Sequence, residues 1–112
     1  MLRRARVVGD SMVPVLREGQ GVLVATWAYR LRAPARGEVA VVRHPHAPLR
    51  LVKRIAAVPG DEVGSRTLGP DEYWVLGDRA AASTDSRAWG ALPRSHLVGP
   101  VLASYRPLRR VR

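Results

Sequence analysis

The sequence contains no cysteine, a single lysine and no long apolar run. The absence of cysteine excludes disulfides, thiol catalysis and any zinc or iron–sulfur site with sulfur ligands. The longest apolar stretch, about Val22–Tyr29 and interrupted by Thr26, is far shorter than the roughly 20 residues of a membrane-spanning helix. The basic N-terminus is not followed by an apolar segment, so no secretory signal peptide is expected. We therefore expect a cytoplasmic or membrane-peripheral protein.

Acidic residues are also scarce, with nine against 19 lysines and arginines, which gives a net charge of +10. Such a basic chain suits nucleic acid, an anionic membrane surface or an acidic protein as partner. The chain of 112 residues is long enough for one domain with its own core. We expect residues 1–105 to form that domain. Residues 106–112, with four arginines, are expected to form a basic tail that can contact anionic membrane.

Short apolar segments separated by glycine and proline predict an all-β fold. No stretch of 11 or more residues has helical periodicity, and the ten glycines and nine prolines are spread along the chain. Pro59-Gly60 predicts a tight turn with a return strand at residues 61–63. Runs rich in valine, leucine and isoleucine predict strands at residues 6–8, 21–28, 38–43, 49–58, 73–77 and 97–105. The expected architecture is a compact, barrel-like core of mostly antiparallel strands.

The single lysine lies on the apolar face of one predicted strand. Because side chains alternate along a strand, Lys53 shares its face with Leu51 and Ile55, whereas the flanking arginines point the other way. A buried ammonium is costly unless it is paired or loses its proton. Lys53 is therefore either a paired or snorkelling lysine, or a general base whose pKa is lowered by burial. Arginine could not serve as that base, because it keeps its proton.

A neutral lysine base needs a nucleophile to activate, and Gly9-Asp10-Ser11-Met12-Val13-Pro14 offers a hydroxyl at a bend. Ser11 follows a short apolar segment, and Pro14 fixes the direction in which the chain leaves the bend. Such a bend holds the hydroxyl in place and exposes backbone N–H groups that can form an oxyanion hole. Taken alone, the same motif is also typical of a surface turn.

Four segments of the sequence can be read together. They are Gly9-Asp10-Ser11-Met12-Val13-Pro14-Val15-Leu16, Arg36-Gly37-Glu38-Val39-Ala40-Val41, Val52-Lys53-Arg54-Ile55 continuing to Pro59-Gly60-Asp61, and Gly77-Asp78-Arg79 with Ser83-Thr84-Asp85-Ser86-Arg87 and Trp89-Gly90. Together they resemble the conserved blocks of the signal peptidase I family of serine–lysine proteases. They occur in the family's order and span most of the chain, from the nucleophile motif to the block after the lysine.

The resemblance implies roles for individual residues. Ser11 would be the nucleophile, its backbone N–H an oxyanion donor, and Lys53 the general base. Ser83 would orient the lysine amine, and a salt bridge between Asp85 and Arg87 would brace the loop beside it. Small apolar pockets for the substrate would be bordered by Val7, Met12, Leu16 and Val52. The implied activity is that of an endopeptidase that removes a leader or propeptide after small residues, as in Ala-X-Ala, with no cofactor and no metal.

The sequence departs from the family's pattern in several places. Gly9 stands where some members have a serine whose hydroxyl stabilises the oxyanion, so backbone groups would have to form the hole. Arg79 stands where asparagine is usual. Only 16 residues separate the Pro-Gly turn from Gly77, so we do not expect the family's large inserted domain. We expect no membrane anchor either. This layout is similar to the soluble branch that matures nickel-dependent superoxide dismutase.

Other functions account for parts of the sequence. A self-cleaving regulator has a similar core and bend, but we expect no DNA-binding segment before Ser11. A non-catalytic basic β-barrel that binds nucleic acid would explain the charge, with Trp27 and Tyr29 stacking on bases. It would not explain the lone lysine or the four ordered motifs, and its affinity would fall steeply with salt. His44-Pro45-His46 could supply two metal ligands, but without a further partner nearby a surface turn is favoured.

Overall fold

The computed structural model describes residues 2–7, 9, 11–105 and 109–110. Its main sheet has the strand order β1-β2-β8-β3-β4-β7, with every neighbouring pair antiparallel, and β9 pairs with β8. A separate hairpin joins β5 to β6. In chain order the elements are β1 (Leu2–Arg6), β2 (Gly21–Ala25), α1 (Ala28–Leu31), β3 (Val39–Arg43), β4 (Arg50–Ala57), β5 (Glu62–Val63), β6 (Arg66–Thr67), β7 (Trp74–Leu76), η1 (Ala80–Ala82), α2 (Ser86–Trp89), η2 (Arg94–His96), β8 (Leu97–Tyr105) and β9 (Arg109–Arg110).

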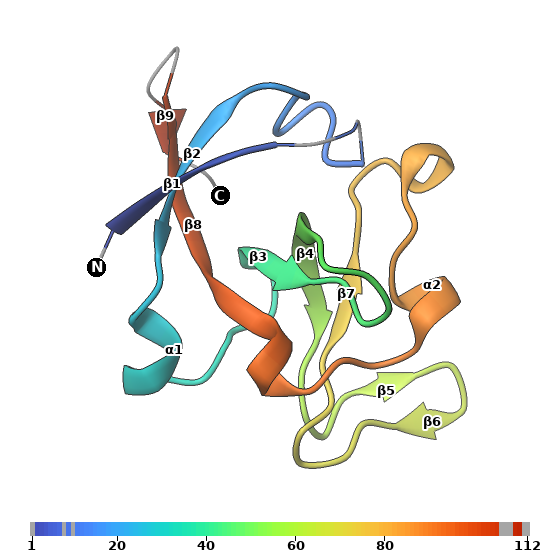
Figure 1. Cartoon of the computed structure of the whole chain (residues 1–112). Helices are drawn as coiled ribbons and strands as arrows, with labels where there is room; N and C mark the ends of the chain where they lie inside the picture. The colour runs from blue at the N-terminus through green and yellow to red at the C-terminus, as the bar shows by residue number, and fades with distance from the viewer. Residues whose placement is uncertain (1, 8, 10, 106–108, 111–112) are drawn as a thin grey trace.

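Strand β8 connects two groups of strands. Its first half pairs with β3 and its second half with β2, so it passes from the β3-β4-β7 group to the β1-β2 ribbon (Figure 1). Gly99 lies within β8 where the chain packs closely against the end of β2. A Cβ atom at Gly99 would lie 2.5 Å from the carbonyl oxygen of Ala25, a distance that side chains do not tolerate. The absence of a side chain at Gly99 therefore allows this crossing.

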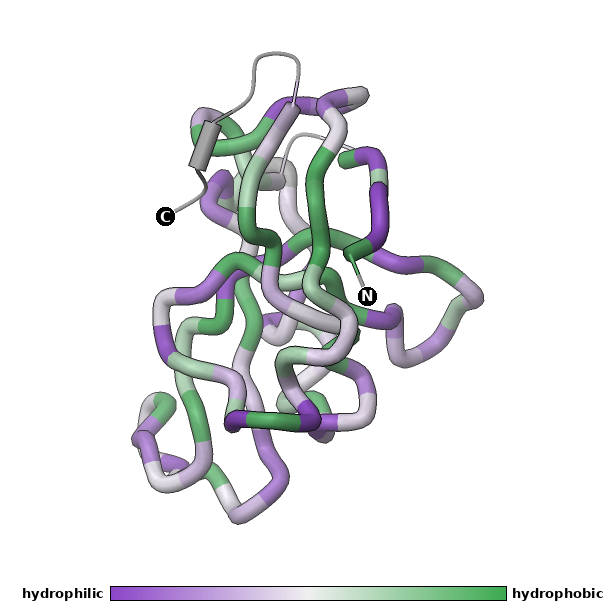
Figure 2. Tube along the Cα trace, turned by 90° about the vertical axis from the view of Figure 1, so that its left-hand side faces the viewer, coloured by the Kyte–Doolittle hydropathy of each residue, from purple (hydrophilic) through white to green (hydrophobic). Residues whose placement is uncertain are grey.

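Two apolar clusters form the core. Strand β3 is buried over its first four residues and contributes to both clusters, because alternate side chains point to opposite faces. Hydrophobic residues accordingly run through the central strands (Figure 2). One cluster contains Val7, Met12, Leu16, Val22, Val24, Val39, Val41, Val52 and Val101. The other contains Tyr29, Ala40, Val42, Ile55, Tyr73, Val75, Leu92 and Leu97.

The all-β prediction is confirmed, but the first strand lies elsewhere than predicted. Strand β1 comprises Leu2–Arg6 rather than residues 6–8. Three of its five residues are arginines and four are exposed, so the segment lacks the apolar pattern of a buried strand. It forms instead because its backbone pairs with β2 at the edge of the sheet.

Helices are few and short in the described part of the chain. Helices α1 and α2 have four residues each, which is too short for a periodic pattern in the sequence. None of the described helices is long and apolar enough to cross a membrane. Of the predicted basic tail, residues 106–108 and 111–112 lie outside the described residues, while Arg109–Arg110 form β9.

Candidate active site

Ser11 is placed by a loop whose two ends are joined by hydrogen bonds. The N–H and carbonyl of Val7 pair with the backbone of residues 19–20 at 2.9 and 2.8 Å, which extends the β1–β2 ribbon by one step. Within the loop, the Leu16 N–H donates to the Met12 carbonyl at 2.9 Å. Both side chains are fully buried in the first core cluster and anchor the loop. Ser11, which precedes this turn, is only 7% exposed.

Lys53 lies in the middle of β4 and reaches Ser11. In the β3–β4 ladder it stands opposite Ala40, and the residue is only 3% exposed. Its Nζ lies 3.0 Å from the Ser11 Oγ and 3.1 Å from the Ser83 Oγ, within hydrogen-bonding distance of both hydroxyls. The structure therefore brings together three residues that are separated in sequence by 42 and 30 positions.

The Ser83 hydroxyl contacts both the Lys53 amine and the Asp85 carboxylate, and the carboxylate holds it in position. The Ser83 hydroxyl donates to the Asp85 Oδ2 at 2.7 Å, and the Gly77 N–H donates to the same oxygen at 2.9 Å. Arg87 donates from its backbone N, its Nε and its Nη2 to the carboxylate, at 3.1, 2.9 and 2.6 Å. Asp85 is almost wholly buried, and it also caps the N-terminus of α2. These contacts join Arg87, Asp85, Ser83, Lys53 and Ser11 in one chain of interactions.

Burial and neighbouring groups shift the pKa values of both Lys53 and Asp85. Burial lowers the pKa of Lys53, the Asp85 carboxylate opposes this, and the Arg87 guanidinium adds to it. The net pKa of Lys53 lies below its ordinary value, which favours the neutral amine. Burial alone would raise the pKa of Asp85, but hydrogen bonds from Arg87, Gly77 and Ser83 outweigh it and leave this pKa below its ordinary value.

Gly77 is a site residue for which the sequence analysis proposed no role. A Cβ atom at this position would lie 2.2 Å from the Ser83 Oγ and 2.9 Å from the Ser11 Cβ. The backbone of Gly77 therefore passes between the two hydroxyl-bearing residues, where only glycine fits. The position of Gly77 in the last motif segment is the one sequence feature that points to it. Its contact with Ser11 joins residues 66 positions apart, so no local sequence pattern predicts that contact.

The residues after Gly77 tie the same segment to the Ser11 loop. The Arg79 N–H donates to the Ser11 carbonyl at 2.6 Å, a bond that the backbone supplies. The replacement of the usual asparagine by Arg79 therefore leaves this bond available. Asp78 is held by a bidentate ion pair with Arg54, at 2.9 and 2.8 Å. Arg54 also donates to the carbonyl of Gly37 at 2.8 Å, which links β4, the end of β7 and the turn before β3.

Gly9 has a φ of +79°, in the left-handed region that side chains rarely adopt. A serine at this position would strain the backbone, although nothing would obstruct its Cβ. The four residues predicted to border substrate pockets, Val7, Met12, Leu16 and Val52, are all buried in the first core cluster. Met12 and Val52 adjoin Ser11 and Lys53 in sequence, and their contact with a substrate stays a prediction.

A groove of about 150 Å³ lies between β1 and the first half of β4. In the described part of the chain β1 pairs only with β2, and β4 pairs with β7 only from Arg54 onward, so Arg50–Lys53 has an unpaired edge beside the groove. Such an edge can accept an extended peptide by backbone hydrogen bonds. The groove is lined by Arg3, Arg4, Ala5, Arg6, Val24, Thr26, Val41, Arg50, Leu51, Val52 and Val98.

Within the described residues, no three histidine, cysteine, aspartate or glutamate side chains are grouped as a metal site would require. His44 and His46 lie in a loop, where the His46 N–H donates to the His44 Nδ1 at 3.0 Å. This hydrogen bond occupies the His44 Nδ1, one of the nitrogen atoms with which the two histidines could bind a metal. The loop conformation of this segment agrees with the predicted surface turn.

Replacement of Asp85 by asparagine should destabilise the fold in a pH-dependent way. The carboxylate has a lowered pKa, so its stabilisation is present above the unfolded-state value of about 3.9 and is lost as the pH falls below it. We expect Asp85→Asn to cost about 2–3 kcal/mol at neutral pH, because Arg87 and the Gly77 N–H lose a charged partner. Urea denaturation near neutral pH and near pH 3 measures this cost. An equal cost at both pH values would contradict an electrostatic origin.

The all-β fold thus holds a buried serine hydroxyl against a buried lysine amine. Residues 1–67 and 64–105 match the family described as signal peptidase, peptidase S26. The chain therefore belongs to the signal peptidase family.

Individual relatives agree with this assignment. A probable signal peptidase I-2 from Synechocystis sp. is 31% identical, with 94% of this chain and 63% of that protein covered. A signal peptidase I from Leptolyngbya laminosa is 27% identical over 94% of this chain and 69% of its own length. A mitochondrial ATP-independent inner membrane protease subunit 1a from Arabidopsis thaliana is 33% identical over 91% of this chain and 69% of its own length. The chain thus spans somewhat under two thirds of the Synechocystis protein.

Proposed function

We propose that this protein is a serine endopeptidase that uses Ser11 as nucleophile and Lys53 as general base. The observation that carries the proposal is the position of the Lys53 Nζ, 3.0 Å from the Ser11 Oγ in a buried setting that lowers the lysine pKa. A structural lysine is normally paired with a carboxylate or reaches water. Lys53 instead contacts two hydroxyls, and Ser83 stands between it and the Asp85 carboxylate.

The proposed reaction follows from these contacts. Neutral Lys53 accepts the Ser11 proton as the Ser11 Oγ attacks a peptide carbonyl. The ammonium then protonates the leaving amine, and an acyl-enzyme remains on Ser11. Lys53, neutral again, activates a water that hydrolyses the ester and frees Ser11. Ser83 acts as a positioning residue. Its hydroxyl oxygen accepts a hydrogen bond from the Lys53 amine, and its O–H group donates a hydrogen bond to the Asp85 carboxylate. The Ser11 backbone N–H is the proposed oxyanion donor.

The proposed substrate is a protein leader or propeptide cleaved after small residues. An extended substrate segment would pair with the open edge of β4 at Arg50–Lys53 and lie in the groove beside β1. Val7, Met12, Leu16 and Val52 are proposed to limit the size of the residues before the cleaved bond. The relatives support this substrate class, since two of them are named as signal peptidases and one as an inner membrane protease.

Mass spectrometry of a defined peptide mixture tests the proposal. The mixture contains Ala-X-Ala leaders, propeptides of nickel-type superoxide dismutase and the same peptides with bulky residues before the bond. Wild-type protein should cleave the small-residue peptides, and Ser11→Ala should cleave none. Preference for the superoxide dismutase propeptides would assign the protein to that maturation branch. Cleavage that persists in Ser11→Ala would refute the proposed nucleophile, and absence of cleavage by wild-type protein on all peptides would count against a peptidase.

The pH dependence of hydrolysis should report the Lys53 amine. Activity is expected to rise with pH as Lys53 loses its proton, with a midpoint below the ordinary lysine pKa of about 10.4. The Asp85 carboxylate raises the Lys53 pKa, so Asp85→Asn should move this midpoint to still lower pH, even though its maximal rate falls. Initial rates of kcat/KM across the pH range measure both effects. A midpoint that Asp85→Asn leaves unmoved would argue against Lys53 as the titrating base.

A further inference from the structure

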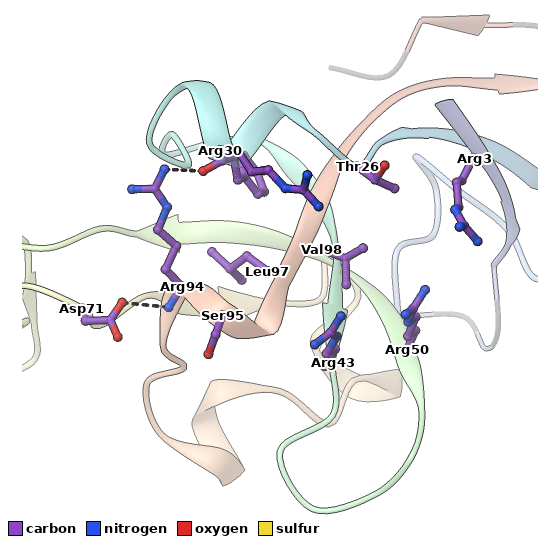
Figure 3. Close-up of a pocket in the computed structure, with 11 residues that line it drawn as sticks. Arg3, Thr26, Arg30, Arg43, Arg50, Asp71, Arg94, Ser95, Leu97 and Val98 are labelled. Carbon is purple, nitrogen blue, oxygen red and sulfur yellow. Dashed lines mark hydrogen bonds between the residues drawn. The ribbon is translucent and has the colours of Figure 1, made fainter. Parts of the chain in front are cut away.

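A second, larger cavity adjoins the groove beside β1, with which it shares Arg3, Thr26, Arg50 and Val98, and it gathers arginine side chains. It has a volume of about 630 Å³ and is here named the arginine pocket. Figure 3 shows that its side chains come from different elements around one opening. Among the described residues that line it, Asp71 is the single acid. The arginines are Arg3 from β1, Arg30 from α1, Arg43 from β3, Arg50 from β4 and Arg94 from η2.

Two of these arginines stand directly opposite each other. Arg43 and Arg50 are partners in the β3–β4 ladder, so their Cβ atoms lie about 5 Å apart. Like charges at such positions destabilise a sheet unless an anion compensates them. Within the described residues, Arg3, Arg30, Arg43 and Arg50 form no ion pair with a carboxylate. The pocket therefore holds positive charge that a bound anion would stabilise.

The remaining charged residues of the pocket form its wall. Arg94 donates from its Nη2 to the carbonyls of Tyr29 and Arg32, the latter at 2.8 Å, and thereby fixes α1. The Asp71 Oδ1 accepts the Arg94 backbone N–H at 2.9 Å. Elsewhere in the described part of the chain, Arg32, Arg36, Arg54, Arg66 and Arg87 are paired with carboxylates, whereas Arg4, Arg6, Arg17 and Arg79 are not. Within the described residues, four guanidinium groups without an ion pair thus share one cavity, where their planar donors can bind phosphate oxygens in pairs.

Exposed apolar side chains lie next to the arginine pocket. Trp27, the N-cap residue of α1, and Leu31, its last residue, are 37% and 79% exposed, and their sequence neighbours Thr26 and Arg30 line the pocket. Arg30 of the pocket lies between them in sequence. Leu49, also exposed, directly precedes Arg50. A tryptophan and leucines beside basic residues suit the boundary between lipid headgroups and acyl chains. Free phosphate or a nucleic-acid backbone would leave Leu31 in water.

We propose that the arginine pocket binds the phosphate groups of anionic phospholipids and docks the protein on a membrane surface. The arginines supply the charge that selects anionic headgroups, and Trp27 and Leu31 enter the interface beside them. This docking surface lies within the folded core rather than in residues 106–112, and the proposal does not depend on the proposed peptidase activity.

Vesicle sedimentation of the full chain tests the proposal. Vesicles with about one third phosphatidylglycerol in phosphatidylcholine should bind the protein, and pure phosphatidylcholine should not, at about 0.1 M salt where the Debye length is about 10 Å. Arg43→Glu reverses one charge of the pocket and should weaken partitioning roughly 25-fold, since each basic residue near such a surface contributes about fivefold. Arg17→Glu makes the same charge change at an exposed position outside the pocket and should weaken partitioning less than about fivefold.

Further variants and competition experiments test whether the bound anion is a lipid headgroup or another phosphate. Arg43→Glu should fold normally, because the new carboxylate faces Arg50, and its melting temperature checks this. Trp27→Ser with Leu31→Ser should also weaken vesicle binding, whereas Leu102→Ser, at another exposed apolar position, should not. Equal losses in Arg43→Glu and Arg17→Glu would overturn the proposal in favour of net charge. Full release from vesicles by glycerol phosphate or by an oligonucleotide at matched phosphate concentration would overturn it in favour of those ligands.

Discussion

Ser11→Ala and Lys53→Arg are each expected to lower kcat by at least about 10³-fold while the fold stays intact. Alanine removes the attacking oxygen. Arginine keeps a positive charge and cannot release its proton, so it cannot accept the Ser11 proton. A positioned general base typically contributes about 10²–10⁴-fold, and removal of a nucleophile commonly costs more. Because Lys53 is buried against Ser11 and Ser83, its amine is the base in reach of the hydroxyl.

The measurement is single-turnover cleavage of a peptide with Ala-X-Ala before the bond, with circular dichroism and melting temperature as controls of the fold. Arg54→Lys is a matched control on the same strand, since its side chain pairs with Asp78 rather than with the Ser11 hydroxyl. It should retain most of the activity. Substantial cleavage by Lys53→Arg would rule out the proposed base. Loss of activity together with loss of the folded signal would identify a folding defect instead.

Gly77→Ala is expected to lower activity by about 10²-fold or more and to destabilise the fold by about 1–3 kcal/mol. The added methyl would lie 2.2 Å from the Ser83 Oγ and 2.9 Å from the Ser11 Cβ, so at least one of the two serine side chains must move. A displacement of about 1 Å in a catalytic geometry can cost about 10²-fold in rate. The loss should appear in kcat more than in KM, because the methyl disturbs the reacting groups rather than the groove.

Gly69→Ala provides the matched control for this prediction. A Cβ atom at Gly69 would meet the end of the flexible Glu72 side chain at 3.2 Å, which can move aside. Peptide hydrolysis and urea denaturation of both variants give the two effects. If Gly77→Ala and Gly69→Ala retained equal activity, the close contact between Gly77 and the two serines would be irrelevant to the reaction.

Much of the candidate site could be predicted from local features of the sequence. The alternation of residues in β4 predicts that Lys53 shares the apolar face with Ile55, and both residues are buried. The bend at Ser11 and the ordered motifs indicate which hydroxyls belong with the lysine. These predictions succeed because strand periodicity and turn chemistry act over a few residues.

Other features arise from contacts between distant segments, which no short pattern encodes. The sequence does not predict the bounds of β1, because its three arginines interrupt the alternation of apolar and polar residues. The strand forms by pairing with β2. The function of Gly77 depends on where the Ser11 loop and the segment at Ser83 meet. The arginine pocket depends on the register that sets Arg43 against Arg50. The sequence shows the surplus of arginines, whereas only the fold shows which of them share a cavity.

The position of β8 has a consequence for the order of events during synthesis. This strand is the hydrogen-bonded link between the ribbon that leads to Ser11 and the strands that carry Lys53. Residues 97–105 leave the ribosome after all other residues of the site, so the two halves cannot be joined through the sheet until this strand has been synthesised. A nascent chain would therefore remain without a formed Ser11–Lys53 contact. Separately expressed fragments that end before β8 should be inert until a peptide containing this strand is supplied.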